Sequence, residues 1–223
     1  MRLLLFLLSG TLLAAGPNEI VSLRLDTDAP LVLDPDAALW RKAEPAYAAN
    51  GRWGEPVPGS KRTEIRSRWS DGYLYLLYTC PYQQLHLKPN PVTNAETNHL
   101  WDWDVAEAFI GVDPDHIDHY TEYEVSPQGE WVDLDINRTN RASPGIEWNS
   151  GFEARARIDA AHHTWYAAMK IPFAALGVKP PPQLRINLYR IEGPPPDRRY
   201  FAWQPTRSET FHVPAAFGRM VLK

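Results

Sequence analysis

The segment from Trp101 to Asp113 contains one carboxylate and two aromatic rings that could act together on a ligand. From Asp104 onward its side chains alternate along a strand, and both faces are mostly apolar, which indicates a strand in the middle of a sheet. Glu107 on this strand is costly to bury unless its carboxylate has partners. It could accept hydrogen bonds from a polyhydroxylated ligand while Trp101 or Trp103 offers a flat apolar face. The alternative is an ion pair between Glu107 and one of the later arginines.

Paired carboxylates could instead hydrolyse glycosidic bonds, since most glycoside hydrolases use two acids that flank the scissile bond. The candidate acids are Asp102, Asp104, Glu107 and Glu124. Acidic residues are abundant in this chain, and nothing in the sequence distinguishes a general acid among these four. A non-catalytic binding protein is therefore the favoured interpretation, with a glycoside hydrolase as the alternative.

A short loop after the central strand could hold a metal ion. Asp113, Asp115 and Asp118 place three hard oxygen donors close together in the sequence. Calcium takes six to eight oxygen ligands, so backbone carbonyls and water would have to complete the shell, and the spacing is not that of an EF-hand. The loop is a candidate for a structural calcium ion, and the alternative is a solvated acidic turn.

The elements that must position these residues are short strands at even spacing. Turn residues such as those at 70–72 and 127–129 separate several of them into hairpins. The expected strands cover residues 20–25, 63–69, 73–80, 104–112, 120–126, 131–136, 152–159, 165–171, 184–191, 200–203 and 219–222. Short helical turns are expected at 34–40 and 172–177, the first because Asp34 can cap a helix that begins at Pro35. The pattern predicts an all-β protein, an antiparallel β-sandwich with short helical turns.

The strand at 184–191 carries polar residues on one face. Arg185, Asn187 and Tyr189 alternate with Leu184, Ile186 and Leu188. Side chains two residues apart on a strand point the same way, so these three polar groups form a row. They are candidate ligand contacts.

Composition limits the kinds of partner. The chain has 223 residues with a formal net charge of -4, and its acidic and basic residues are interleaved. A single domain with a sizeable core suits this length. Because there is no basic stripe, nucleic acid and anionic membranes are not expected as partners. Cys80 is the only cysteine, so an internal disulfide is not possible.

The first residues have the pattern of a secretory signal peptide. Arg2 precedes an apolar run, which ends in the small residues Ala14, Ala15 and Gly16. The run is shorter than the roughly 20 residues of a transmembrane helix, so no membrane span is expected. We therefore expect a signal peptide at residues 1–16, a mature domain at 17–223, and a secreted or periplasmic location.

Several landmarks together resemble the family 9 carbohydrate-binding modules and the wider DOMON-like β-sandwich group. The resemblance covers nearly all of the mature chain, and it rests on the order and spacing of its parts. These parts are residues 33–40, Asp71-Gly72-Tyr73-Leu74-Tyr75, Trp101 to Glu107, residues 123–129, 168–177, 185–190 and 211–218.

The resemblance implies a sugar held between two aromatic rings in a cleft on one sheet. It assigns the first ring to Trp101, the acid to Glu107 and an amide to Asn187. Trp203 is the candidate for the second ring, with Tyr189 in reserve. The family's basic contact on the hairpin after the central strand has no match in residues 120–126. Either Arg190 replaces it or the ligand differs from the family's.

The resemblance further implies an exported protein that takes part in carbohydrate catabolism beside a separately encoded glycan-degrading enzyme. It also raises haem binding as a second alternative, because some DOMON-like relatives ligate haem through Met, His or Lys. Met169 falls in the apolar row of its strand, which favours core packing over haem ligation. His212 is expected to fasten the last turn of the chain, with a contact at the rim of the ligand site as the alternative.

Overall fold

The computed structural model describes residues 18–140 and 145–223, and within them the chain is almost entirely β-structure. Every strand expected from the sequence is present. The strands are β1 (Glu19–Arg24), β2 (Ala46–Ala48), β3 (Asn50–Gly51), β4 (Thr63–Trp69), β5 (Tyr73–Pro81), β6 (Val105–Gly111), β7 (His119–Val125), β8 (Trp131–Asn137), β9 (Glu153–Asp159), β10 (Thr164–Pro172), β11 (Gln183–Glu192), β12 (Arg199–Ala202) and β13 (Gly218–Leu222). Three single-turn 3-10 helices, η1 (Gly59–Lys61), η2 (Leu100–Asp102) and η3 (Pro214–Ala216), connect some of them. The predicted signal peptide, residues 1–16, lies outside the described residues.

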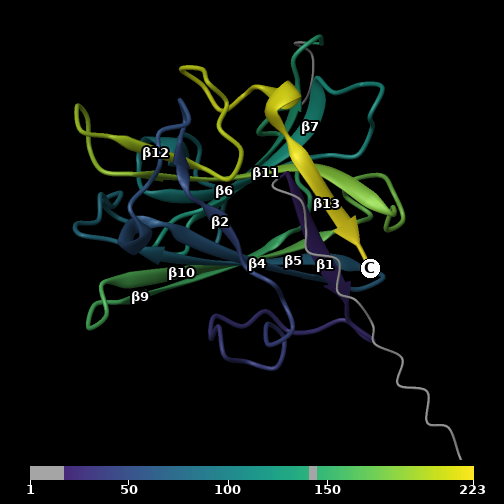
Figure 1. Cartoon of the computed structure of the whole chain (residues 1–223), viewed down its shortest axis with the longest axis horizontal. Coiled ribbons are helices and arrows are strands. Elements are labelled where there is room, and N and C mark those ends of the chain that lie inside the picture. The colour runs from purple at the N-terminus through teal and green to yellow at the C-terminus, as the bar shows by residue number, and fades with distance from the viewer. Residues whose placement is uncertain (1–17, 141–144) are drawn as a thin grey trace, which may run out of the picture.

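The strands form two layers that pack face to face (Figure 1). One layer has the order β8-β7-β6-β11-β13-β1, with β12 beside β11, and we call it the β6 sheet. The other has the order β1-β4-β5-β10-β9, and we call it the β5 sheet. Strand β1 belongs to both, because Glu19 to Ser22 pair with β13 while Leu23 and Arg24 pair with β4. The predicted sandwich is confirmed, and β6 lies inside its sheet, between β7 and β11.

One feature differs from a purely antiparallel sandwich. Strand β1 runs parallel to both β13 and β4, whereas the other strand pairs are antiparallel within the described parts of the chain. The pairing of β1 with β13 joins the two ends of the described chain. A hairpin rule cannot predict such a pair, because hairpin rules apply to strands that are neighbours in sequence.

The main core lies between the two sheets. Ala106, Ala108 and Ile110 of β6 face inward, against side chains such as Trp165 and Met169 of β10, and all five are buried. Burial of an aliphatic or aromatic side chain of this size stabilises the fold by about 1.5–3 kcal/mol. Met169 therefore has the core-packing role expected from the sequence.

A second apolar cluster covers the outer face of the β6 sheet. It contains Val105 and Phe109 of β6, Leu134 of β8, Tyr189 of β11 and Phe211 from the segment before η3. Because side chains alternate along β6, the residues between its core-facing alanines must point to this outer face. The register therefore places Glu107 here, on the side away from the main core.

The segment that covers the outer face of the β5 sheet corrects one expectation. The short helix predicted at 34–40 is a series of turns, in which the N–H of Ala37 donates to the carbonyl of Asp34 and that of Trp40 to Ala37. Trp40 is fully buried with Tyr75 and Leu77, so burial of its ring, rather than a helix, holds the segment in place. Across the described residues, none of the helices has the length and apolar character needed to cross a membrane.

Candidate functional site

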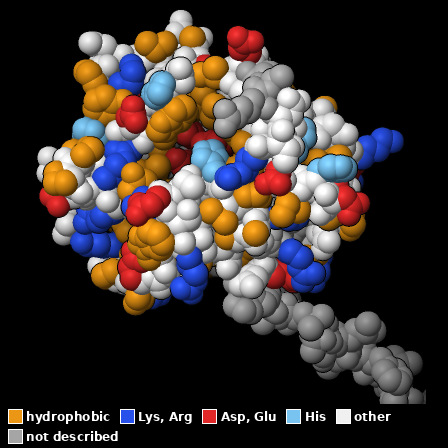
Figure 2. All heavy atoms as spheres, turned by 90° about the horizontal axis from the view of Figure 1, so that it is seen from above, with side chains coloured by type: hydrophobic (Ala, Val, Ile, Leu, Met, Phe, Trp, Pro, Cys, Tyr) orange, Lys and Arg blue, Asp and Glu red, His pale blue; other side chains and the backbone are white. Residues whose placement is uncertain are grey.

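A pocket of about 260 Å³ opens on the outer face of the β6 sheet. Figure 2 shows a hollow on this side of the molecule, where acidic and histidine side chains lie among hydrophobic ones. Three sets of residues line the pocket: apolar and aromatic side chains, two buried acids, and the segment from Glu209 to His212. The full set is Trp101, Glu107, Phe109, Glu122, Leu134, Ile136, Ile191, Tyr200, Glu209, Thr210, Phe211 and His212.

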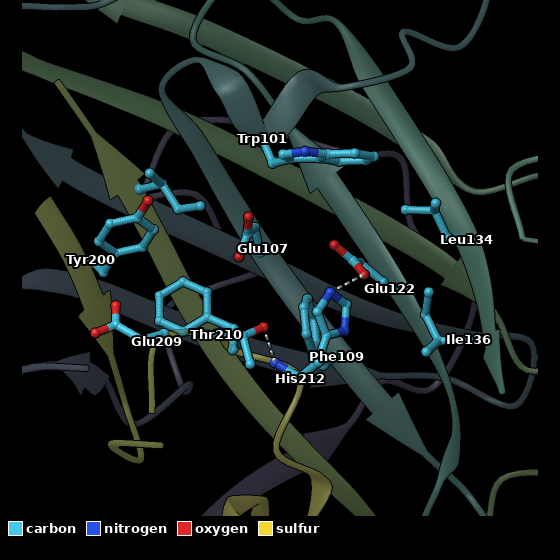
Figure 3. Close-up of a pocket in the computed structure, with 12 residues that line it drawn as sticks. Trp101, Glu107, Phe109, Glu122, Leu134, Ile136, Tyr200, Glu209, Thr210 and His212 are labelled. Carbon is cyan, nitrogen blue, oxygen red and sulfur yellow. Dashed lines mark hydrogen bonds and ion pairs between the residues drawn. The ribbon is translucent and has the colours of Figure 1, made fainter. Parts of the chain in front are cut away.

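Trp101 forms one wall of this pocket. In Figure 3 its ring lies at one side, and the carboxyl groups of Glu107 and Glu122 lie between it and His212. Arg198 holds the backbone of η2, because its guanidinium donates to the carbonyl oxygens of Asp102 at 2.7 Å and Trp103 at 2.9 Å, and also to that of Trp101. The Trp101 ring is therefore presented on a turn whose carbonyl groups are satisfied by a charged donor.

The base of the pocket is acidic. Glu107 lies opposite Glu124 in the register of β6 and β7, and Phe109 lies opposite Glu122, so all three carboxyl groups point to the outer face. Glu107, Glu122 and Glu124 are 2%, 4% and 0% exposed. One carboxyl oxygen of each lies within 4.8 Å of the others.

Burial changes the ionisation of this cluster. It raises the pKa of Glu107 and Glu124 well above their ordinary value, and the neighbouring carboxylates add to the effect. It also raises the pKa of Glu122 to about 7. The positive charge of Arg198 lowers the pKa of Glu107 and Glu124, but this effect is smaller than that of burial. Among the described residues no lysine or arginine forms an ion pair with Glu107, so the arginine partner considered from the sequence is not found there.

His212 forms the wall opposite Trp101 and also fastens the segment that carries it. Its Nδ1 is hydrogen-bonded to the hydroxyl of Tyr120 at 2.8 Å, and its Nε2 lies 3.9 Å from a carboxyl oxygen of Glu122. Burial and the nearby charge of Arg138 lower the pKa of His212 to about 4, so the ring is neutral at neutral pH. The structural role expected for His212 and a position at the pocket are therefore found together.

Asn187 and Tyr189 lie on the same sheet face as Glu107, but both serve the scaffold. The amide of Asn187 donates to the carbonyl of Gln204 at 2.9 Å and accepts from the backbone of Leu188 and Gln204. The Tyr189 ring stacks on Phe211 with centroids 3.9 Å apart, and its hydroxyl donates to the Phe211 carbonyl. Neither residue is among those that line the pocket.

Arg190 and Trp203 point to the opposite side of the sheet. Arg190 is fully buried, pairs with Glu192 and donates to the carbonyl of Pro81 at 2.7 Å. Trp203 is 7% exposed and belongs to the main core. Its ring lies so close to Gly218 that a Cβ added there would be 2.4 Å from it. The structure therefore does not bring either residue into the pocket.

The remaining candidates lie at the edge of the site or away from it. Trp103 stacks on His86, with centroids 4.6 Å apart, and does not line the pocket. Asp104 is buried and accepts the N–H groups of His86 and Gly193, so it holds two loops together. Of the proposed hydrolytic acids, Glu107 and Glu124 lie together, with one carboxyl oxygen of each within 4.8 Å of the other. Glu124 does not line the pocket, so this pair does not flank a ligand held there.

The acidic turn after β6 lies outside the pocket. Asp113 accepts the N–H of Asp115 at 2.8 Å and contacts Nδ1 of His116 at 2.8 Å. Asp118 lies 3.8 Å from Nε of Arg138. A calcium ion at this turn would have to compete with these contacts, and the calcium site stays a prediction.

Sequence reasoning missed most of the other lining residues. Tyr200, Phe211 and Leu134 come from segments far from Trp101 in the chain, and only the fold brings them together. Glu122 could have been found, because it alternates with Glu124 along a predicted strand and so shares its face. The presence of two acids on one face of a largely buried strand is the signal that could have identified Glu122.

The fold and the pocket define the protein as a β-sandwich with a small recess on one outer sheet face, partly lined by aromatic rings. The chain belongs to the carbohydrate family 9 binding domain-like family, whose model matches residues 35–223. A search of curated proteins finds no match.

Solved structures share the fold at low sequence identity. A protein from Bacteroides uniformis, assigned provisionally as carbohydrate-binding, superposes with a TM-score of 0.71 at 15% identity over 92% of this chain and 99% of its own. A family 9 carbohydrate-binding module from Caldicellulosiruptor kristjanssonii, in complex with cellotriose, gives a TM-score of 0.63 at 15% identity over 92% of this chain and 93% of its own. A family 9 module from the same organism in complex with glucose gives a TM-score of 0.63 at 16% identity, over 92% of this chain and 95% of its own.

Proposed function

We propose that the protein binds a saccharide in the pocket beneath Trp101 and does not hydrolyse it. The observation that carries the proposal is the position of the Trp101 ring across a small recess from the carboxyl groups of Glu107 and Glu122. A pyranose presents C–H groups on its face and hydroxyl groups at its rim. An indole face therefore removes apolar area from water while carboxyl oxygens pair with the hydroxyl groups.

The size of the pocket indicates how much of a saccharide it holds. Its volume of about 260 Å³ is below the roughly 300–1,000 Å³ of pockets that enclose drug-sized ligands. One sugar ring, such as a monosaccharide or a chain end, suits it better than the interior of a long polymer. Tyr200 and Phe211, in place of Trp203, supply further aromatic surface.

The proposal has support from relatives. Modules of the same family from Caldicellulosiruptor kristjanssonii are described in complex with glucose and cellotriose. At about 15% identity these structures support the fold, and the choice of sugar has to come from the lining residues of this chain. Glu107 and Glu122 give the base of this pocket carboxyl oxygens that can pair with the hydroxyl groups of a sugar.

The experiment is calorimetric titration with a panel of mono- and oligosaccharides that includes glucose and cellotriose. We expect saturable binding of at least one member and no release of shorter sugars on prolonged incubation. Turnover of any oligosaccharide that is lost in Glu107→Gln would instead make the protein a glycoside hydrolase. Failure of every saccharide to bind would reject the proposal.

We also propose that residues 1–16 direct export, so that the protein acts outside the cytoplasm beside a separately encoded enzyme of carbohydrate catabolism. The support is the apolar run that ends at Ala14, Ala15 and Gly16. Amino-terminal sequencing of protein recovered from the periplasm or medium tests this. A mature protein that still begins at Met1 in the cytoplasm would contradict it.

Finally, we propose that Asp113, Asp115 and Asp118 form a structural calcium site. The support is three carboxylates in one short turn of a fold whose single cysteine allows no internal disulfide. An ion bound only by the folded protein would raise its melting temperature by mass action. An equal melting temperature in chelator and in millimolar calcium would reject calcium as a structural ion of this protein.

A further inference from the structure

The glutamate cluster of β6 and β7 contains more carboxyl groups than contacts with a sugar require. Glu107, Glu122 and Glu124 come from two adjacent strands, and each is at least 96% buried. A carboxylate at this depth is costly unless a cation or hydrogen-bond donors compensate its charge. Three such groups within 4.8 Å of one another repel strongly when they are ionised.

The carboxyl oxygens are also poorly satisfied. One oxygen of Glu107 accepts no hydrogen bond from the described residues. Neither oxygen of Glu124 accepts a hydrogen bond from the described residues, and the only group it can donate to when protonated is the neighbouring carboxyl group of Glu122. Buried polar atoms of folded proteins nearly always have a partner, and each exception requires an explanation such as an ion.

Among the described residues, no lysine or arginine forms an ion pair with the cluster, although the charge of Arg198 lowers the pKa of Glu107 and Glu124 in part. Arg198 is directed to the carbonyl oxygens of Trp101, Asp102 and Trp103, and forms no ion pair with a glutamate in the structure as described. His212, the nearest basic group, lies 3.9 Å from Glu122. Phe109 lies opposite Glu122 and Tyr189 lies opposite Glu107, and both rings belong to the apolar cluster on this sheet face.

We propose that Glu107, Glu122 and Glu124 together bind one divalent cation at the base of the pocket. Calcium–oxygen bonds of about 2.3–2.6 Å allow two ligand oxygens on the same ion to be up to about 5 Å apart. The mutual separation of 4.8 Å or less therefore suits a single ion without movement of the strands. The ion also provides the missing partner for the free oxygens of Glu107 and Glu124.

The depth of Glu124 distinguishes an ion from a ligand with an ammonium group. Glu107 and Glu122 line the pocket, but Glu124 does not. A sugar ring beneath Trp101 would be held above Glu124, whereas a bare ion can reach all three carboxylates. The side of the ion that faces the pocket is left for water or for hydroxyl groups of the saccharide. This last role alone depends on the proposed saccharide binding.

His212 is positioned to add a nitrogen ligand to the three carboxylates of the proposed ion site. When its Nδ1–H donates to the Tyr120 hydroxyl, Nε2 carries a lone pair directed toward the pocket, 3.9 Å from Glu122. Three carboxylates suit calcium and manganese, and an added imidazole suits manganese or zinc. The test therefore compares these three ions.

The experiment uses the full mature protein, stripped of metal with chelator and then titrated separately with calcium, manganese and zinc chloride, without any saccharide. In the Asp115→Asn, Asp118→Asn background, which removes the calcium site proposed for the acidic turn, we expect one of the ions to bind with a stoichiometry near one and to raise the melting temperature as its concentration increases. Adding Glu124→Gln to this background should weaken the binding at least tenfold, and adding Glu122→Gln should do the same. The matched control is Glu44→Gln at an exposed position, which should leave the binding unchanged.

Three outcomes would overturn the proposal. The first is no ion binding with a stoichiometry near one in the acidic-turn background, and the second is ion binding there that survives both glutamine changes. The third is binding of glucosamine to the chelated protein, weakened by Glu124→Gln, in the absence of ion binding, which would identify an ammonium ligand. Because no neutral saccharide is present, the result is independent of whether the protein binds sugar.

Discussion

Glu107 and Glu124 face each other across the antiparallel pair of β6 and β7, and both carboxyl groups are buried. Like charges directly opposite each other destabilise a sheet, and here burial adds to the cost. The strand pair is nevertheless intact over five residue pairs, from Ala106 opposite Val125 to Ile110 opposite Thr121. The surrounding packing must therefore offset the unfavourable free energy of this acidic pair.

We first predict that Glu124→Gln stabilises the chelator-treated protein. The change removes one buried acid but keeps the shape of the side chain. We expect the free energy of unfolding at pH 8 to rise by about 1 kcal/mol, which corresponds to about 2–4 °C in melting temperature for a chain of this length. Glu44→Gln, at an exposed position, serves as the control and should have little effect. A lower melting temperature for Glu124→Gln would show that the carboxyl group stabilises the metal-free fold.

The second prediction concerns Trp101. We expect Trp101→Ala to weaken saccharide binding at least tenfold, or about 1.4 kcal/mol, because the ring supplies the apolar face of the pocket. Trp103→Ala is the matched control, since that ring stacks on His86 outside the pocket. Calorimetry gives the affinities, and circular dichroism checks the fold. Equal affinity losses in both variants would reject Trp101 as the ring that contacts the sugar.

The third prediction separates Trp203 from the site. Trp203→Ala should lower the free energy of unfolding by about 3–5 kcal/mol, because it empties a large volume in the main core. Saccharide affinity, measured at a temperature at which the variant remains folded, should stay within about threefold of the original, since Trp203 does not line the pocket. Denaturant unfolding and calorimetry measure the two quantities. A stable variant that no longer binds sugar would return Trp203 to the role of second stacking ring.

The fourth prediction is a pH dependence at Glu96, which anchors the segment before η2 against Asp133. Burial, then the charge and hydrogen bond of Asp133, raise the pKa of Glu96 to about 7. The folded state therefore binds this proton more tightly than the unfolded chain does. The resulting stability is fully present below the ordinary pKa of 4.5 and is lost as the pH rises through 7.

Glu96→Gln tests this dependence, because glutamine cannot ionise but can still donate to Asp133. We expect the loss of melting temperature between pH 5 and pH 8 to be smaller in Glu96→Gln than in the original protein. Glu44→Gln should keep the original dependence. Identical pH profiles for the original protein and Glu96→Gln would show that Glu96 does not titrate in this range.

The sequence by itself determined the strands and the orientation of the central one. Hairpins such as β4 with β5 are local, so turn residues between alternating segments are enough to predict them. The same alternation placed Glu107 on one face of the strand and Ala106 and Ala108 on the other face, which points into the core. The sequence also placed Trp101 just upstream of that strand, where the chain enters the sheet. These conclusions hold because side-chain direction on a strand depends on a two-residue period alone.

Only the tertiary structure decided which aromatic and charged residues share the pocket. Trp203 belongs to the main core and Arg190 is buried against Trp165 of that core, whereas Tyr200 and Phe211 reach the site. On a strand, a shift of one residue moves every side chain to the other face. The pairing of β11 with β12 therefore decides which of their side chains face the core and which face the pocket. Phe211 and His212 arrive from a segment about a hundred residues beyond Trp101, through contacts that no local pattern encodes. The acidic cluster likewise exists because the register of β6 and β7 aligns Glu107 with Glu124, a relationship between two strands rather than a property of either one.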